Sequence, residues 1–198
     1  MAKRIIIQCR VMSNRLPGKA LLTIYGLPLI IAIIKRIKGF TKDIYVCTTK
    51  NKEDNILCNI LKAEKIKYIR GPEKNVLKRF IICSKDLKAE DTIIRLTADN
   101  PLPDKYFLRE MNKIWSKNNF AYLASESKKN NIPKGLSAEF FKVKYLRKAY
   151  RDAKTQKEKE HVTTFIIKNE KTNYLSKKFI KKRTKKTFGI DTLNDYFK

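Results

Sequence analysis

Short apolar runs rich in β-branched residues recur along the first half of the chain, and each is followed by a polar loop. We expect buried strands at Arg4–Gln8, Asp43–Thr48, Lys67–Ile69 and Thr92–Leu96. Helical periodicity lies between these runs, over Leu29–Lys38 and on the faces formed by Ile56, Leu57, Ile60 and Leu61 and by Val76, Leu77, Phe80 and Ile81. This alternation predicts an α/β domain with a largely parallel sheet.

The second half of the chain is less regular. We expect helices over Lys105–Lys117, Tyr145–Ala153 and His161–Ile167, and strands over Phe120–Ser125, Leu136–Lys142 and Thr187–Asp191. No repeat or linker divides the chain, and 198 residues is an ordinary length for one domain. We therefore expect a single domain over residues 1–198, with ligands bound beyond the carboxyl ends of the parallel strands.

The chain is strongly basic, with 46 Lys and Arg against 19 Asp and Glu and a formal charge of +27. Such a charge favours a polyanion or nucleic-acid binder as one hypothesis. The excess is spread over both halves, and abundant Lys, Ile and Asn indicate a compositional bias as the alternative. Lys177 to Lys186 forms the densest basic run, which suits either a phosphate-rich partner or a solvated face.

Several classes of protein are excluded by pattern. The longest apolar run, Leu27 to Ile34, is too short for a membrane span, and the N-terminus lacks the apolar segment of a secretory leader. We therefore expect a cytoplasmic protein. Its four cysteines are irregularly spaced, which argues against a zinc site or a disulfide framework and predicts reduced, mostly buried thiols.

The loop after the first expected strand, Cys9 to Lys19, carries the residues of a phosphate site. Arg10, Arg15 and Lys19 surround Ser13, Asn14 and a glycine. Arg supplies forked donors, Lys a mobile charge, and a glycine turn lets backbone N–H groups approach an anion. The spacing is not that of a P-loop. Because basic loops are common in so basic a chain, composition alone leaves an ordinary solvated loop as the alternative.

Two acids follow expected strand ends. Asp99 comes after the fourth strand in R-L-T-A-D-N-P, and Asp191 ends the last one in F-G-I-D-T. Paired carboxylates suit Mg²⁺, which takes one or two of them and leaves its other positions to water and phosphate. The alternatives are local: Asp99 can cap a turn, and Asp191 can begin a helix as its N-cap.

Six blocks in order resemble one family. The opening I-I-I-Q-C-R-V-M-S-N-R-L-P-G-K-A-L-L is similar to the start of the SpsF-type cytidylyltransferases of surface polysaccharide biosynthesis and, more distantly, of the CMP-sugar-acid synthetases such as CMP-Kdo synthetase. The later blocks are R-G-P-E-K-N-V-L-K-R-F, R-L-T-A-D-N-P-L, G-L-S-A-E-F-F, E-H-V-T and G-I-D-T-L-N-D. The family's usual residues are replaced at Cys9, Asn100, Leu193 and Asn194, while the charged positions are intact.

The resemblance implies a nucleotide-diphospho-sugar transferase fold, with a nucleotide part at about 1–104 and an acceptor part at about 105–198. It assigns nucleotide binding to Arg10, Ser13, Asn14, Arg15, Lys19, Arg70, Arg79 and Thr97, and catalysis to Arg15, Lys19 and Asp99. It assigns acceptor binding to Glu139, Glu160 and His161, and magnesium to Asp99 and Asp191. For His161, a capping or packing role is the alternative.

The activity implied by the resemblance is magnesium-dependent transfer of CMP from CTP to a small anionic sugar or sugar acid, with loss of pyrophosphate. No nucleophilic side chain is needed for such a transfer. The competing hypothesis is a member of weak or absent activity that binds nucleic acid or another polyanion. A homodimer is compatible with the sequence, which does not fix the oligomeric state.

Overall fold

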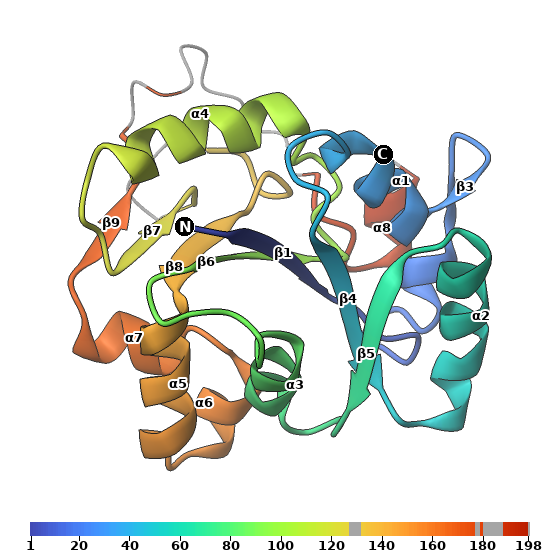
Figure 1. Ribbon diagram of the computed structural model, residues 1–198. Helices are drawn as coiled ribbons and strands as arrows, with labels where there is room; N and C mark the ends of the chain where they lie inside the picture. The colour runs from blue at the N-terminus through green and yellow to red at the C-terminus, as the bar shows by residue number, and fades with distance from the viewer. Residues whose placement is uncertain (127–131, 177–178, 180–187, 198) are drawn as a thin grey trace.

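The structure is a computed structural model that describes residues 1–126, 132–176, 179 and 188–197. One seven-stranded sheet runs through it in the order β5-β4-β1-β6-β8-β7-β9 (Figure 1). The strands are β1 (Lys3–Gln8), β4 (Ile44–Thr49), β5 (Lys67–Gly71), β6 (Thr92–Thr97), β7 (Tyr122–Ala124), β8 (Glu139–Lys142) and β9 (Thr172–Tyr174).

The sheet is mixed. Strands β5, β4, β1 and β6 are parallel, as their apolar sequences predict, and Ile5 of β1 lies between Ile44 of β4 and Ile94 of β6. Strand β8 joins this half through antiparallel pairing with both β6 and β7, and β9 adds parallel to β7. The expected α/β fold with a largely parallel sheet is confirmed.

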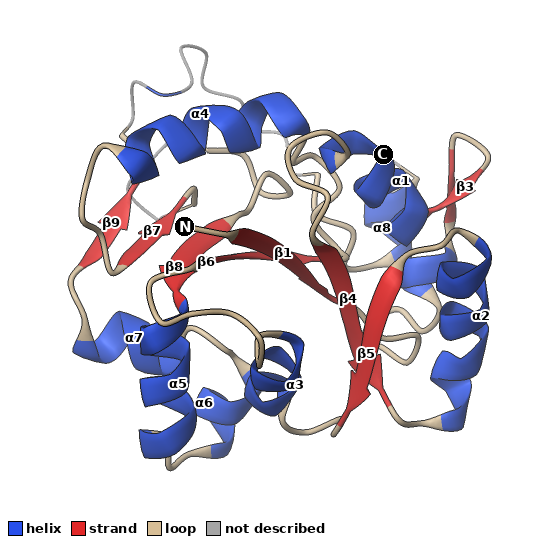
Figure 2. Cartoon of the chain, viewed as in Figure 1, coloured by secondary structure: helices blue, strands red, loops and turns tan. Residues whose placement is uncertain are grey.

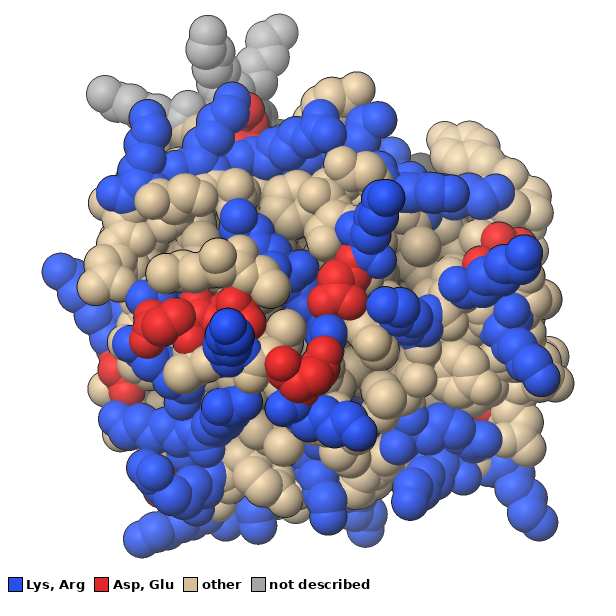
Figure 3. All heavy atoms as spheres, in the orientation of Figure 1, with Lys and Arg blue, Asp and Glu red and all other residues tan. Residues whose placement is uncertain are grey.

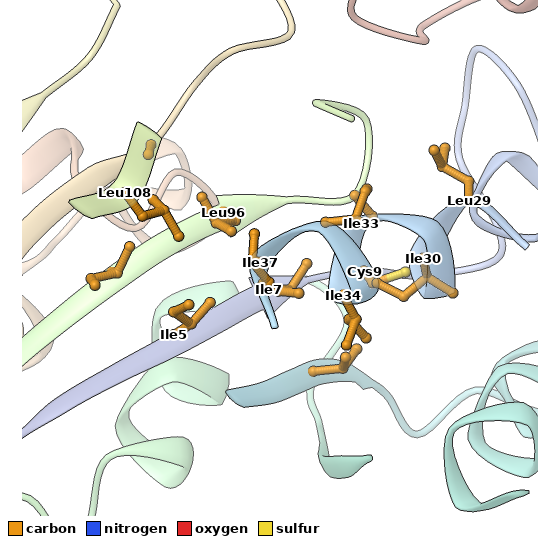
Figure 4. Packing of buried hydrophobic residues seen from close by; sticks show 14 of the residues in the cluster. Ile5, Ile7, Cys9, Leu29, Ile30, Ile33, Ile34, Ile37, Leu96 and Leu108 are labelled. Atoms are coloured by element: carbon orange, nitrogen blue, oxygen red, sulfur yellow. The ribbon is translucent and has the colours of Figure 1, made fainter. Parts of the chain in front are cut away.

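Helices cover both faces of the sheet (Figure 2). On one face lie α1 (Leu29–Ile37), α2 (Asn55–Ala63) and α4 (Lys105–Ser116), and on the other lie α3 (Val76–Cys83) and α5 (Val143–Asp152) with α6 (Gln156–Glu160) and α7 (Thr164–Asn169). Successive β1 side chains alternate between the two cores, so Ile5 and Ile7 pack against α1 while Ile6 faces α3. Figure 4 shows the first core, where α1 isoleucines meet β1, Leu96 and Leu108.

Several expected elements have different bounds. The helix expected over His161–Ile167 is wrong at its start, because α6 ends at Glu160 and α7 begins only at Thr164. The strand expected over Thr187–Asp191 is also wrong where the structure describes it: residues 188–191 are irregular. Its backbone bonds instead to two loops, with Phe188 N donating to Lys134 O and Ile190 N to Asp99 O.

The sequence patterns did not predict several short elements. A hairpin of β2 (Thr23–Ile24) and β3 (Leu27–Pro28) turns at Tyr25 and Gly26, which both have positive φ. The 3-10 turns η1 (Lys19–Leu21) and η2 (Lys52–Asp54) and the helix α8 (Leu193–Tyr196) complete the elements. Most of the basic run Lys177 to Lys186 lies outside the described residues.

The charge is dispersed over the visible surface. Figure 3 shows Lys and Arg across the whole of one face, with small groups of Asp and Glu between them. None of the helices in the described part of the chain has the length and hydropathy of a membrane span.

Candidate active site

A pocket opens at the carboxyl ends of β1 and β6, where parallel α/β sheets place their ligands. Its walls come from the loop after β1, the start of α3, the β6–α4 loop and the end of α6. The lining residues are Gln8, Cys9, Arg10, Ser13, Arg15, Lys19, Ala20, Glu73, Val76, Arg79, Thr97, Ala98, Asp99, Glu160 and His161. Most residues assigned from the sequence therefore share one cavity.

The loop after β1 is closed at its base. Cys9 N donates to Cys47 O at 3.1 Å, and Gly18 N donates to Val11 O at 2.8 Å, which brings the two ends of the loop together. Gly18 has a φ of 76°, a left-handed conformation that glycine adopts without strain. The loop then passes into η1, which places the Lys19 side chain over the strand ends.

Asp54 holds this loop to the sheet, a role that the sequence patterns did not indicate. Its side chain is 2% exposed and accepts from Val11 N at 2.7 Å, from Thr48 Oγ1 at 2.9 Å, and from both the N–H and the hydroxyl of Thr49. A buried carboxylate with this many donors is well stabilised. The one signal in the sequence that could have indicated Asp54 is its place shortly after a parallel strand, which is also the pattern at Asp99.

Lys19 joins the two acids assigned to magnesium. Its Nζ lies 3.0 Å from Asp99 Oδ2 and 3.3 Å from Asp191 Oδ1, and it also donates to Ile190 O at 3.3 Å. The Lys19 side chain is only 11% exposed, so these oxygens replace most of its water. The structure thus brings together three residues that are far apart in sequence.

The approach of Asp191 to Asp99 depends on backbone contacts. Ile190 N donates to Asp99 O at 2.9 Å, which anchors the segment before Asp191 beside the β6–α4 loop. Gly135 allows this path: its φ is 96°, and a Cβ on it would lie 2.6 Å from the carbonyl carbon of Phe188. A side chain at position 135 would therefore push the C-terminal segment away from the site.

Asp99 is held ionised. Burial raises the pKa of its carboxyl, but the charge of Lys19 and hydrogen bonds from Thr97 and Lys19 outweigh burial and leave the pKa below its ordinary value. Thr97 Oγ1 donates to Asp99 Oδ1 at 2.5 Å, and Asn100 Nδ2 donates to Thr97 Oγ1. Thr97 therefore lines the pocket with its hydroxyl committed to Asp99.

The remaining loop residues have different positions. Ser13 and Arg15 line the pocket, and Arg15 Nη2 donates to Asp191 Oδ1 at 2.6 Å. Asn14 is exposed and outside the lining. Arg10 also lines the pocket, where its guanidinium pairs with Glu73 at 2.6 Å. Glu73 was not singled out from the sequence, and it also accepts from Asn51 Nδ2 at 2.9 Å.

Of the two arginines in the block at Arg70 to Phe80, only Arg79 reaches the pocket. Arg79 Nη1 donates to Pro72 O and Glu73 O and so shapes the turn before α3, and its stem packs so close to Gly71 that a Cβ there would lie 2.8 Å away. Arg70 instead donates to Thr49 O, Asn51 O and Asn55 Oδ1, outside the lining.

The three residues assigned to the acceptor are not equivalent. Glu160 and His161 line the pocket and are exposed. His161 is the C-cap that follows α6, and its carbonyl accepts from Thr164 N at 2.7 Å. Glu139 is 13% exposed and is not among the lining residues; it pairs with Arg95 and accepts from Tyr122 Oη at 2.7 Å. Its carboxylate is thus occupied by neighbours within the protein.

The two acids suit magnesium by their chemistry. They are hard oxygen donors, and they already converge on one cation, the Lys19 ammonium. Within the described ranges, no group of three or more His, Cys, Asp or Glu side chains is placed to hold a metal. Two carboxylates completed by water and phosphate oxygens are the arrangement that magnesium commonly takes with nucleotides.

The thiols take no part in this chemistry. All four cysteines are free and buried, as expected, and burial raises the pKa of each. Cys9 lines the pocket, but a buried thiol with a raised pKa remains protonated and unreactive near neutral pH.

Comparison with known proteins identifies the family. The family model "Cytidylyltransferase" matches residues 4–197. The uncharacterized protein MJ1063 of Methanocaldococcus jannaschii is 37% identical over 96% of this chain and 79% of its own length, and the spore coat polysaccharide biosynthesis protein SpsF of Bacillus subtilis is 30% identical over 81% and 68%.

Solved structures agree in fold. A cytidylyltransferase from Leptospira borgpetersenii superposes with a TM-score of 0.89 at 26% identity, covering 99% of this chain and 84% of its own. A CMP:2-keto-3-deoxy-manno-octonic acid synthetase solved with CTP gives 0.71 at 14% identity, covering 100% and 96%. The fold is that of the nucleotide-diphospho-sugar transferases, as expected, and the chain belongs to the cytidylyltransferase family.

Proposed function

We propose that this cytidylyltransferase uses CTP and magnesium to transfer CMP to a small anionic sugar or sugar acid, releasing pyrophosphate, in the synthesis of a surface polysaccharide or glycan precursor. The observation that carries this proposal is the convergence of Lys19, Asp99 and Asp191 at the strand ends, beside Arg15. Two similar proteins support the substrate class: SpsF is named for spore coat polysaccharide biosynthesis, and the structure solved with CTP is a synthetase of CMP:2-keto-3-deoxy-manno-octonic acid.

The site residues fit the charge changes of such a transfer. An acceptor hydroxyl oxygen bonds to the α-phosphorus and loses its proton to water, while the bond from that phosphorus to the bridging oxygen of pyrophosphate breaks. Lys19 and Arg15 offset the negative charge on the phosphate oxygens, because both cations lie at one side of the pocket. Ser13 adds a hydroxyl donor from the same loop.

Asp99 and Asp191 are the residues that would hold magnesium. When bound there, the ion would neutralise phosphate charge and polarise a phosphoryl oxygen as a Lewis acid. Asp99 is suited to this because its pKa is held below the ordinary value, which keeps its carboxylate charged. Basic residues around the pocket also favour an anionic acceptor, and exposed Glu160 and His161 stand at the rim as its candidate contacts.

The first test is the thermal stability of the purified protein with CTP, UTP, ATP or GTP, each with and without Mg²⁺. A ligand that binds only the native state raises the midpoint by mass action. We expect a magnesium-dependent rise that is largest with CTP. If no nucleotide shifts the midpoint while polyanion affinity falls steeply with salt, the chain is a basic binding module instead.

A further inference from the structure

The amide of Gln8 has a fixed orientation at the floor of the pocket. Gln8 ends β1, is half-buried, and accepts at Oε1 from Arg95 Nε at 3.1 Å. A guanidinium only donates, so the amide oxygen must face Arg95 and the NH₂ group must point the other way. An amide rotated by half a turn would set two donors against each other.

Arg95 cannot move to accommodate the opposite orientation. It is 14% exposed and pairs with Glu139, which is 13% exposed. Glu139 in turn accepts from Tyr122 Oη at 2.7 Å and Thr163 Oγ1 at 3.1 Å. This chain of buried contacts fixes the position of Arg95, so the orientation of the Gln8 amide is set before any ligand arrives.

The Gln8 NH₂ group is available to a ligand. Within the part of the chain that the structure describes, no hydrogen bond uses Gln8 Nε2 as donor, although Gln8 lines the pocket. Neighbouring polar groups are already paired: the Thr97 hydroxyl donates to Asp99, and Glu73 accepts from Arg10 and Asn51. Gln8 thus contributes a neutral donor to the lining of the pocket, on the strand next to Thr97.

We propose that Gln8 recognises the cytosine ring of the nucleotide and contributes to the preference for CTP over UTP, an inference that rests on the proposed function. The N3 atom of cytosine is an acceptor, which a fixed NH₂ donor matches, whereas O2 is an acceptor in both cytosine and uracil and does not discriminate between them. Uracil carries a hydrogen on N3 and would present a donor to a donor. Mismatched polar groups in a desolvated site discriminate strongly between such ligands.

Gln8→Glu tests this directly, because it keeps the size of the side chain and an oxygen toward Arg95 but replaces the NH₂ donor with an acceptor. Calorimetric titration with CTP and UTP in Mg²⁺ gives both dissociation constants. We expect the dissociation constant for CTP to rise about tenfold or more. The specificity ratio, which is the dissociation constant for UTP divided by that for CTP, should fall about tenfold. Gln156→Glu, at the only other glutamine and exposed on α6, makes the same charge change and should keep the ratio.

Gln8→Glu adds a negative charge next to the pair of Arg95 and Glu139, and this charge could itself disturb the site. Gln8→Leu removes the NH₂ donor without adding a charge, and it should also reduce the ratio. Glu139→Gln tests the positioning role: it should lower the ratio while the protein remains folded by circular dichroism. An unchanged ratio in folded Gln8→Glu and Gln8→Leu, with wild type preferring CTP, overturns this inference and leaves the proposed function standing. Wild type without a CTP preference overturns both.

Discussion

The ammonium of Lys19 lies 3.0 Å from a carboxylate oxygen of Asp99, and the same ammonium reaches Asp191, 172 residues away in sequence, at 3.3 Å. One cation therefore offsets the repulsion between two acids that the fold brings together. Because the Lys19 side chain is largely buried and that of Asp99 is half-buried, solvent screens this pairing less than it would an exposed one. The site is built around balanced charge, and Lys19 helps to hold the pKa of Asp99 below its ordinary value.

Lys19→Met should raise the pKa of Asp99. In the wild type, burial raises this pKa, but the charge of Lys19 and the hydrogen bonds from Thr97 and Lys19 outweigh burial, so removing Lys19 takes away two of the causes that lower it. The carboxyl carbon shift of Asp99, followed by NMR against pH, measures the change. Lys157→Met, at an exposed lysine, should leave the titration where it is. If the titration midpoint of Asp99 stays low in Lys19→Met, Lys19 is not what lowers the pKa of Asp99.

Asp99→Asn should abolish the magnesium-dependent stabilisation by CTP while barely changing the fold. Asn has the same shape but no charge, and a neutral amide is a poor magnesium ligand beside Lys19. The measurement is the midpoint shift with CTP, with and without Mg²⁺, and far-ultraviolet circular dichroism checks the fold. Asp152→Asn removes a half-exposed acid that pairs with Arg151, and it is the matched control. A normal magnesium effect in Asp99→Asn would rule out the metal role of this residue.

Asp54→Ala should destabilise the protein and weaken CTP binding together. The change leaves Val11 N and the Thr48 and Thr49 donors without their buried acceptor, which costs roughly 2–4 kcal/mol. It also frees the base of the loop that carries Arg15 and Lys19. Urea unfolding gives the stability, and titration of the folded variant with CTP at low temperature gives the affinity. If stability falls but affinity does not, Asp54 supports the core without placing the loop.

The regular half of the fold was predictable because its signals are local. Each parallel strand is a contiguous buried run, and helix faces such as that of Leu57 and Leu61 repeat every three or four residues. Strand β9, with three residues, is too short to show a period. The segment at 188–191 has strand-like residues, yet its partners are the carbonyls of Lys134 and Asp99 in loops, which no local pattern reveals.

The residues of the candidate site also divide into those with a local sequence signal and those whose role depends on contacts with distant residues. Arg15, Lys19 and Asp99 follow strand ends in sequence, so both the pattern and the family resemblance indicated them. In the sequence, Gln8 is only the polar end of an apolar run. Its role in the site depends on the hydrogen bond from Arg95, 87 residues away, which orients its amide. The family resemblance implies an acceptor role for Glu139, whereas the structure pairs its carboxylate with Arg95 and leaves it out of the pocket lining. Long-range polar contacts of this kind require the fold to be known.

Acid sensitivity should depend on Arg4, which is 4% exposed and bridges two distant acids. Its Nε donates to Asp43 at 2.7 Å, and Nη1 and Nη2 donate to the two oxygens of Asp86 at 2.7 and 2.8 Å. The hydrogen bonds from Arg4 lower the pKa of Asp86 from 3.8 to about 2. Because the folded pKa lies below the ordinary one, the pair stabilises the fold fully above about pH 4, and this stabilisation is lost as the pH falls through about 2.

Arg4→Met should also lower the free energy of unfolding at pH 7 by roughly 1–2 kcal/mol, because the buried guanidinium donates to charged groups, while water can rehydrate the exposed Asp86 carboxylate after the change. It should also flatten the fall in stability between pH 5 and pH 2.5, because Asp86 then titrates alike in both states. Urea unfolding of both proteins at pH 7, 5 and 2.5 measures these differences. Arg151→Met, which breaks the exposed pair with Asp152, should leave both the stability and its pH slope close to wild type. A slope in Arg4→Met as steep as that of wild type would show that other carboxylates govern acid unfolding.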